Sequence, residues 1–101
     1  MNLEDFADWV DAIQLRPSVT TDPEKHLAYL GLGLAGEAGE AVEVIKKHLR
    51  DGPLDDAAIR HEMGDVLFFW AGLCRALDLD MSEIMAEART RIDAKIAAAR
   101  P

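Results

Sequence analysis

The chain has 101 residues, of which half are hydrophobic and 30% are charged, and its formal net charge is −8. This length accommodates one domain with a modest core, which we place over residues 1–101. The hydrophobic content excludes a compositionally disordered chain. The acidic balance argues against nucleic-acid binding, which requires clustered Lys and Arg.

The sequence shows no sign of a membrane segment or an export signal. No apolar run reaches the roughly 18 residues that a membrane span needs. The first residues, Met-Asn-Leu-Glu-Asp-Phe, lack the basic start and apolar stretch of a signal peptide. The single cysteine, Cys74, cannot form an intrachain disulfide and fits a reducing compartment. We therefore expect a cytoplasmic protein.

Hydrophobic residues at spacings of three and four predict a first helix over residues 3–15, ended by Pro17 and the stretch from Ser18 to Thr21. Asp22-Pro23 is typical of an N-cap followed by proline, and predicts a long helix over residues 24–50. Its four glycines each cost up to about 1 kcal/mol relative to alanine. We therefore expect close approach by another backbone or a ligand, or else a break near residues 31–33.

The turn Asp51-Gly52-Pro53 should end the second helix. A third helix is predicted over residues 55–77. Asp80 can cap a fourth, which should continue to residue 98 with Glu83 completing a capping box. Four helices with short connections predict an all-α, four-helix bundle-type protomer.

The third helix predicts self-association. Its apolar residues surround most of the helix rather than forming one stripe, and such a helix must be buried on all sides. One small chain can hardly achieve this, so we expect a second subunit to cover the remainder, most simply in a C2 dimer. The residues concerned are Met63, Val66, Leu67, Phe68, Phe69, Trp70, Leu73, Cys74 and Leu77.

Two pairs of acidic residues are the main candidate site. Glu37 and Glu40 are three residues apart, and so are Glu62 and Asp65, so each pair shares one face of its helix. The centre of the two pairs is residue 51, where the turn begins. If the two helices form an antiparallel hairpin, the four carboxylates lie at nearly the same level.

Four converging anions must protonate, recruit basic partners or bind cations. Ligation by carboxylate oxygens alone suits Mg²⁺ or Mn²⁺. Gly36, Gly39 and Gly64 lie next to or within the pairs and could let a ligand and the helices approach closely. The alternative is a solvated acidic face, which is the usual meaning of one such pair.

Several segments resemble the MazG-like nucleotide pyrophosphohydrolases of the all-α NTP pyrophosphatase superfamily. They are Leu30-Gly-Leu-Gly-Leu-Ala-Gly-Glu-Ala-Gly-Glu-Ala-Val-Glu43, Lys46-Lys47, Arg50-Asp-Gly52 and Glu62-Met-Gly-Asp-Val-Leu67. The family pattern of Glu-x-x-Glu, a spacer with a turn, and Glu-x-x-Asp is met by Glu37, Glu40, Glu62 and Asp65. The resemblance extends over about residues 25–92.

The resemblance implies an α-helical dimer or dimer of dimers. It also implies Mg²⁺-dependent cleavage between the α and β phosphates of a (d)NTP, with the four acids as metal ligands. Bound metal would neutralise the triphosphate and activate a water for attack at the α-phosphorus. One carboxylate could act as the general base. Many relatives carry an Asn-x-x-Lys element near the fourth helix, where this chain has Ala88-Arg-Thr-Arg91.

Three further residues are candidates for substrate contacts. Lys47 lies two turns after Glu40 on nearly the same face and could meet phosphates, although a cation in the last turn of a helix also has a purely structural use. Arg91 is the second phosphate candidate. Phe69 follows Asp65 by four residues and is the best candidate for stacking on a base, although a core role is the commoner one.

Two alternatives to a general nucleotide pyrophosphohydrolase remain. One is a catalytically silent helical dimerisation or regulatory module that keeps the acids for structural metal. The other is a relative with a narrow substrate, such as dUTP or phosphoribosyl-ATP. The residues that read the base cannot be separated from core residues by pattern.

Overall fold

The computed structural model describes residues 1–14 and 21–100. Within these ranges the chain forms four helices and no strand, so the all-α class is confirmed. The helices are α1 (Leu3–Gln14), α2 (Pro23–Asp51), α3 (Asp56–Ala76) and α4 (Met81–Ala99). Each described boundary lies within one residue of its predicted place. The expected end of the first helix, at Pro17, lies outside the described residues.

Aspartate side chains cap three of the helices, and the sequence predicts two of these caps, Asp22 and Asp80. The carboxylate of Asp22 accepts hydrogen bonds from the backbone N–H groups of Glu24 and Lys25. Asp55 caps α3 in the same way, and Asp80 caps α4. Because each carboxylate satisfies N–H groups that have no partner inside the helix, these residues set where the helices start.

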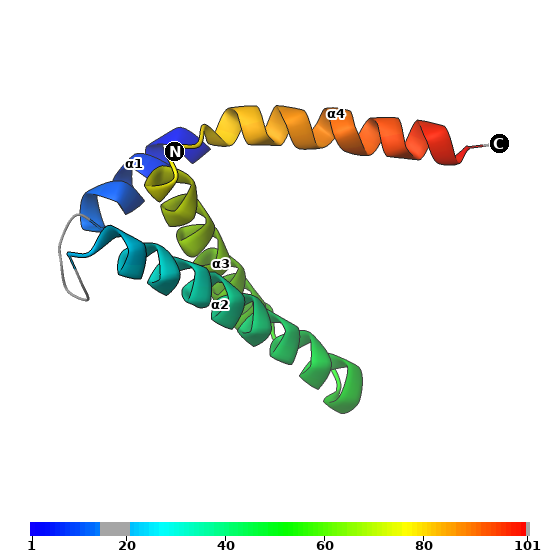
Figure 1. Cartoon of the computed structure of the whole chain (residues 1–101). Helices are drawn as coiled ribbons and strands as arrows, with labels where there is room; N and C mark the ends of the chain where they lie inside the picture. The colour runs from blue at the N-terminus through cyan, green and yellow to red at the C-terminus, as the bar shows by residue number, and fades with distance from the viewer. Residues whose placement is uncertain (15–20, 101) are drawn as a thin grey trace.

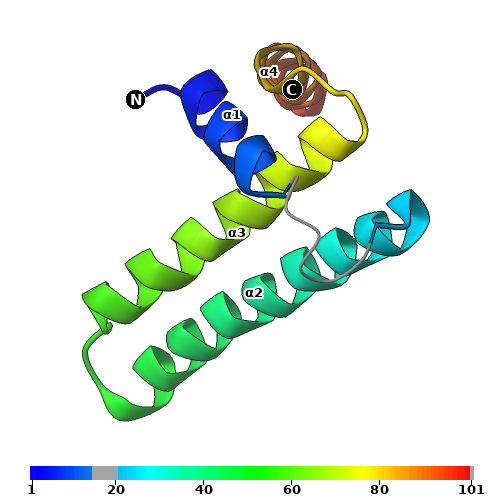
Figure 2. The same ribbon diagram turned by 90° about the vertical axis from the view of Figure 1, so that its left-hand side faces the viewer.

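Helices α2 and α3 form a long antiparallel hairpin (Figures 1 and 2). The turn depends on Gly52, whose φ of 129° is a conformation that favours glycine. Its N–H donates to the carbonyl of His48 at 3.3 Å and closes the end of α2. No break occurs at residues 31–33, since α2 is continuous.

One close contact shows the register of this hairpin. A Cβ at Gly33 would overlap the ring of Phe69, so this glycine lets the α3 ring lie against the α2 backbone. Gly33 and Phe69 are equally far from Asp51 along the chain, each eighteen residues away. The same counting places Glu37 opposite Asp65 and Glu40 opposite Glu62. The centre at residue 51 that the acidic pairs predict is therefore the centre of the observed hairpin.

The core lies at the open end of the hairpin, where α1 crosses α3 and meets the start of α4. Arg75 of α3 fastens α1 by ion pairs to Glu4 at 3.6 Å and Asp8 at 2.7 Å. Partly buried side chains of α1, α3 and α4 surround the core. Its fully buried members are Ala7, Val10, Ala71, Cys74 and Met81.

Helix α4 leaves this core and projects away from the hairpin (Figure 1). It packs through Met81 and Ile84 at its first turn, next to α1. Asp78, with φ of 55°, lies in the short connection where the chain changes direction after α3. In one chain, therefore, α4 does not lie along the hairpin as the fourth member of a closed bundle. None of the helices in the described ranges is long and apolar enough to cross a membrane.

The apolar circumference of α3 is only partly covered within the chain. Phe68 and Trp70 pack against the core, and Phe69 lies against α2. Met63 and Leu77, in contrast, are about half exposed. Cys74 is buried, as predicted.

The contact at Gly33 predicts opposite effects for two glycine substitutions in α2. Gly33→Ala should lower the free energy of unfolding by about 1–2 kcal/mol, because the overlap with Phe69 exceeds the gain in helix propensity. Gly31→Ala, whose Cβ meets no atom of the described residues, should raise it by up to about 1 kcal/mol. Urea unfolding followed by circular dichroism measures both. A Gly33→Ala variant as stable as Gly31→Ala would contradict this register.

Candidate metal centre

Three of the four predicted acids converge between the two arms of the hairpin. One carboxylate oxygen from each of Glu37, Glu62 and Asp65 lies within 4.8 Å of the other two. All three side chains are half-buried. Glu37 comes from α2 and the others from α3, so the folded hairpin is required to assemble the cluster.

Glu40, the fourth predicted ligand, stands beside this cluster rather than in it. It is exposed, whereas Glu37 is half-buried. Three residues of helix rotate it by about 60° from Glu37 toward solvent. Its charge still acts on Glu37. The structure therefore brings three acids together and leaves Glu40 at the rim.

The electrostatics of the cluster concentrate on Glu37. Partial burial raises the pKa of Glu37 above its ordinary value, and a hydrogen bond with Glu62 raises it further. The negative charges of Asp65, Glu62 and Glu40 act in the same direction. A carboxylate in this position is disfavoured unless a proton or a cation compensates it. The donor set of carboxylate oxygens fits a hard divalent cation such as Mg²⁺ or Mn²⁺.

A histidine beside the cluster was missed as a site residue in the sequence. The Nε2 atom of His61 lies 3.2 Å from a carboxylate oxygen of Asp65. The two residues are four apart on α3, a spacing that brings side chains together on a helix and could have indicated the pair. His61 thus contacts one of the three acids of the cluster through an exposed side chain.

The predicted substrate-contact residues differ in their relation to the cluster. Phe69 lies one helical turn from Asp65, on the side of the hairpin nearer the core. Lys47 lies on the other side, next to the turn, and makes no ion pair with the described residues, whereas Lys46 pairs with Glu43 at 3.9 Å. Arg91 belongs to α4, which projects away, so one chain does not bring it to the acids.

The glycines around the acids do not serve close packing of α2 on α3. A Cβ at Gly36, Gly39 or Gly64 would meet no atom of the described residues within 4 Å. The expectation that these positions let the helices approach is therefore wrong within one chain. They leave open space beside the cluster instead.

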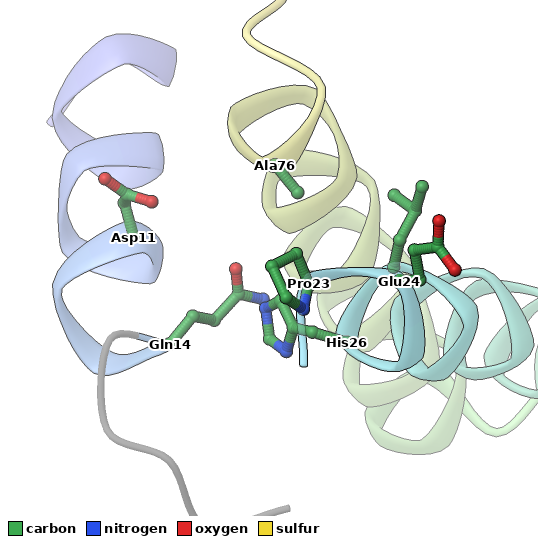
Figure 3. Close-up of a pocket in the computed structure, with 7 residues that line it drawn as sticks. Asp11, Gln14, Pro23, Glu24, His26 and Ala76 are labelled. Carbon is green, nitrogen blue, oxygen red and sulfur yellow. The ribbon is translucent and has the colours of Figure 1, made fainter. Parts of the chain in front are cut away.

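A separate pocket lies at the open end of the hairpin (Figure 3). It has a volume of about 380 Å³ and is lined by residues of α1, the start of α2 and the end of α3. Gln14 points from α1 toward His26, and its amide nitrogen is buried without a hydrogen-bond partner among the described residues. The α2 residues of the pocket precede Glu37 by about three turns, so it is distinct from the acidic cluster.

The fold and the cluster define an all-α protein that carries three converging carboxylates, the donor set of a divalent-cation site, on an antiparallel helical hairpin. Residues 25–98 match the MazG nucleotide pyrophosphohydrolase domain. The chain therefore belongs to the MazG family, as its paired acidic motifs indicate. This span includes nearly all of the hairpin and nearly all of α4.

The chain is also similar in sequence to a phage protein. The chain is 39% identical over 70 residues to the gene 37 protein of Mycobacterium phage L5, a match that includes 62% of this chain. The chain spans 60% of the length of that phage protein. No solved structure matches the chain.

The crowding at Glu37 predicts that Glu37→Gln stabilises the metal-free protein near neutral pH. A raised pKa in the folded state means that stability falls as pH rises through that pKa, and the amide removes this effect. If Mg²⁺ or Mn²⁺ binds at the cluster and raises the melting temperature, the same change should abolish that rise, because a ligand is lost. Thermal unfolding with and without each ion, at several pH values, measures both effects.

The matched control is Glu43→Gln, which removes one carboxylate from α2 outside the cluster. Glu43 pairs with Lys46, so this variant should not gain stability, and it should keep the response to the cation. Equal changes in melting temperature for the two variants, with and without the cation, would mean that the charge of Glu37 is no more unfavourable in the folded protein than that of Glu43.

Proposed function

We propose that this chain is a divalent-cation-dependent nucleoside triphosphate pyrophosphohydrolase. It would cleave the bond between the α-phosphorus and the α–β bridging oxygen of a (d)NTP, releasing the monophosphate and pyrophosphate. The observation that carries this proposal is the convergence of Glu37, Glu62 and Asp65 in a chain of the MazG family. The same two pairs of acids are the pattern by which the sequence resembles that family.

Each acid has a distinct place in the proposed site. Glu37, Glu62 and Asp65 would hold Mg²⁺, with Mn²⁺ as a substitute. When bound, the cation supplies positive charge that neutralises phosphate oxygens and promotes ionisation of water. Glu40 faces solvent at the rim, where it could complete the cation site or accept a proton from the attacking water. Its exposed position suits a group that meets ligand from outside.

The two basic candidates differ in whether a single chain is enough to bring them to the acids. Lys47 is within the same α2 helix as Glu37 and Glu40 and would neutralise phosphates from the turn side. Arg91 can contribute only if α4 of another copy reaches the site, because its own α4 projects away from the hairpin. The proposed role of Arg91 therefore depends on self-association.

We propose self-association as a homodimer or homotetramer, supported by the uncovered apolar side of α2. Val42, Ile45 and Leu49 lie on one flank of the helix, and Leu49 is 80% exposed. These residues border a shallow groove together with Lys46 and Arg50. Helix α4 also exposes apolar residues, namely Met85, Ile92 and Ile96. A single chain offers no partner of its own for these surfaces among the described residues.

Incubation with the four dNTPs, dUTP, the four NTPs and phosphoribosyl-ATP in Mg²⁺ tests the activity. We expect monophosphate and pyrophosphate as products, and a loss of at least about 100-fold in kcat for Glu62→Gln. Glu43→Gln should retain activity. No turnover in Mg²⁺ or Mn²⁺ would leave the regulatory module as the correct description. Turnover of dUTP or phosphoribosyl-ATP alone would establish a narrow substrate, and orthophosphate release would place the cleavage elsewhere.

Substitution of the apolar flank tests self-association. Leu49→Glu should shift the protein toward monomer in sedimentation equilibrium, because a carboxylate in an apolar interface is costly to bury. Glu24→Gln, an exposed change in the first turn of α2, serves as the control and should leave the mass unchanged. A wild-type protein that sediments as a monomer at micromolar concentration would refute the interface.

A further inference from the structure

An aromatic pair stands on the hairpin next to the acidic cluster. The rings of Tyr29 on α2 and Phe69 on α3 lie 6.1 Å apart at an angle of 65°, an edge-on arrangement. Phe69 also contacts Phe68 edge-on at 5.5 Å and lies over Gly33. The ring of Tyr29 is therefore supported from within by a ring that packing holds in place.

Tyr29 and Glu40 share one side of α2, and Glu37 lies about 80° from Tyr29 around the helix axis. Tyr29 precedes Glu37 by eight residues, which is about 12 Å along the helix axis. It differs from Glu40 by only about 20° in direction around that axis. A ligand that lies along this flank would pass from Glu40, across open space at Gly36, to Tyr29.

Exposure distinguishes Tyr29 from its aromatic neighbours. Tyr29 is 44% exposed, whereas Phe69 is half-buried behind it and Phe68 packs on the core. Trp9 is also exposed, at 52%, but it lies on α1 and contacts Phe68 rather than Phe69. Tyr29 thus presents the exposed ring nearest to the cation site on the hairpin.

We propose that Tyr29 is the surface on which the substrate's base stacks, and that Phe69 supports its ring from behind. This inference rests on the proposed function, since it needs a nucleotide whose phosphates meet the acidic cluster. The sugar then spans the flank beside Gly36, and the base reaches Tyr29 about two turns from Glu37. A stacking platform accepts any base by its π-face, so Tyr29 favours nucleotides over inorganic polyphosphate without selecting among bases.

The proposed platform is compatible with self-association through the apolar flank. Val42, Ile45 and Leu49 lie about 160–220° around α2 from Tyr29. A partner that covers those residues leaves Tyr29 and Glu40 accessible on the opposite side. Ligand binding and assembly thus use different faces of the same helix.

Calorimetric titration with non-cleavable α,β-methylene analogues of the four dNTPs, and with inorganic triphosphate, tests the platform in Mg²⁺. Tyr29→Leu should weaken binding of the nucleotide analogues by about tenfold and leave binding of triphosphate unchanged. Tyr29→Phe keeps the ring and should bind as the wild type does. Trp9→Leu is the matched control, removing a ring of similar exposure on α1, and should not change either affinity.

The outcomes separate this inference from the proposed function. Because binding is measured without cleavage, selective loss in Tyr29→Leu supports the platform even if no nucleotide is hydrolysed. Cleavage by the wild type together with unchanged binding in Tyr29→Leu overturns the platform alone. Equal loss for analogues and for triphosphate also overturns it, because the substitution then acts on the whole site. A larger loss of affinity for the nucleotide analogues in Trp9→Leu than in Tyr29→Leu would overturn the platform and indicate that the base stacks on α1.

Discussion

The arrangement of α2 against α3 is the constraint on which the other features depend. The acids that form the cluster come from both helices. The distances between their carboxylates therefore depend on the position of α2 along α3 and on the rotation of each helix about its own axis. Gly33 and Phe69 report this register directly, because an α3 ring occupies the space where an α2 side chain would be. A shift of one residue would rotate an acid by about 100° and separate the carboxylates.

The hairpin also concentrates like charges at a distance from the buried core. The buried core is small and lies at the other end, around Ala7, Val10 and Cys74. Helix α1 is attached there by Arg75 and its two acidic partners. In the part of the hairpin that carries Glu37 and Glu62, the clustered carboxylates repel one another. On the outer side of the same part, apolar residues of α2 such as Leu49 are exposed to solvent. A bound cation and a second copy would each relieve one of these two conditions.

Local chemistry made the helices and much of the site predictable. Asp22 and Asp80 are caps whose role is visible in the sequence, and Gly52 ends α2 as its position in the turn indicates. The convergence of acids followed from counting residues to the turn, because an antiparallel hairpin preserves equal distances on its two arms. Glu40 was harder to place, since a pair three apart shares a face only within about 60°.

The features that sequence reasoning missed depend on contacts between distant elements. The direction of α4 depends on the short connection after α3 and on the packing of the first turn of α4 against the core. The hydrophobic periodicity of the sequence contains no information about either. Because α4 points in that direction, Arg91 lies away from the acids of its own chain. Similarly, the α2 glycine in a close contact is Gly33, whereas a Cβ at Gly31, Gly36 or Gly39 would meet no atom of the described residues within 4 Å. Four glycines in one helix look alike in a sequence, and only the position of Phe69 distinguishes them.

The short loop after α2 has a consequence for how such a chain can change in length during evolution. Residues 52–55 join the two arms but belong to neither helix. An insertion there lengthens the connection and leaves the facing positions of α2 and α3 as they are. A single insertion between Glu40 and Asp51 would instead turn every upstream residue of α2, including Glu37, away from its counterpart. Length variation among relatives should therefore accumulate in this loop. The number of residues between the acids and the loop, in each of the two helices, should stay constant or change by whole helical repeats.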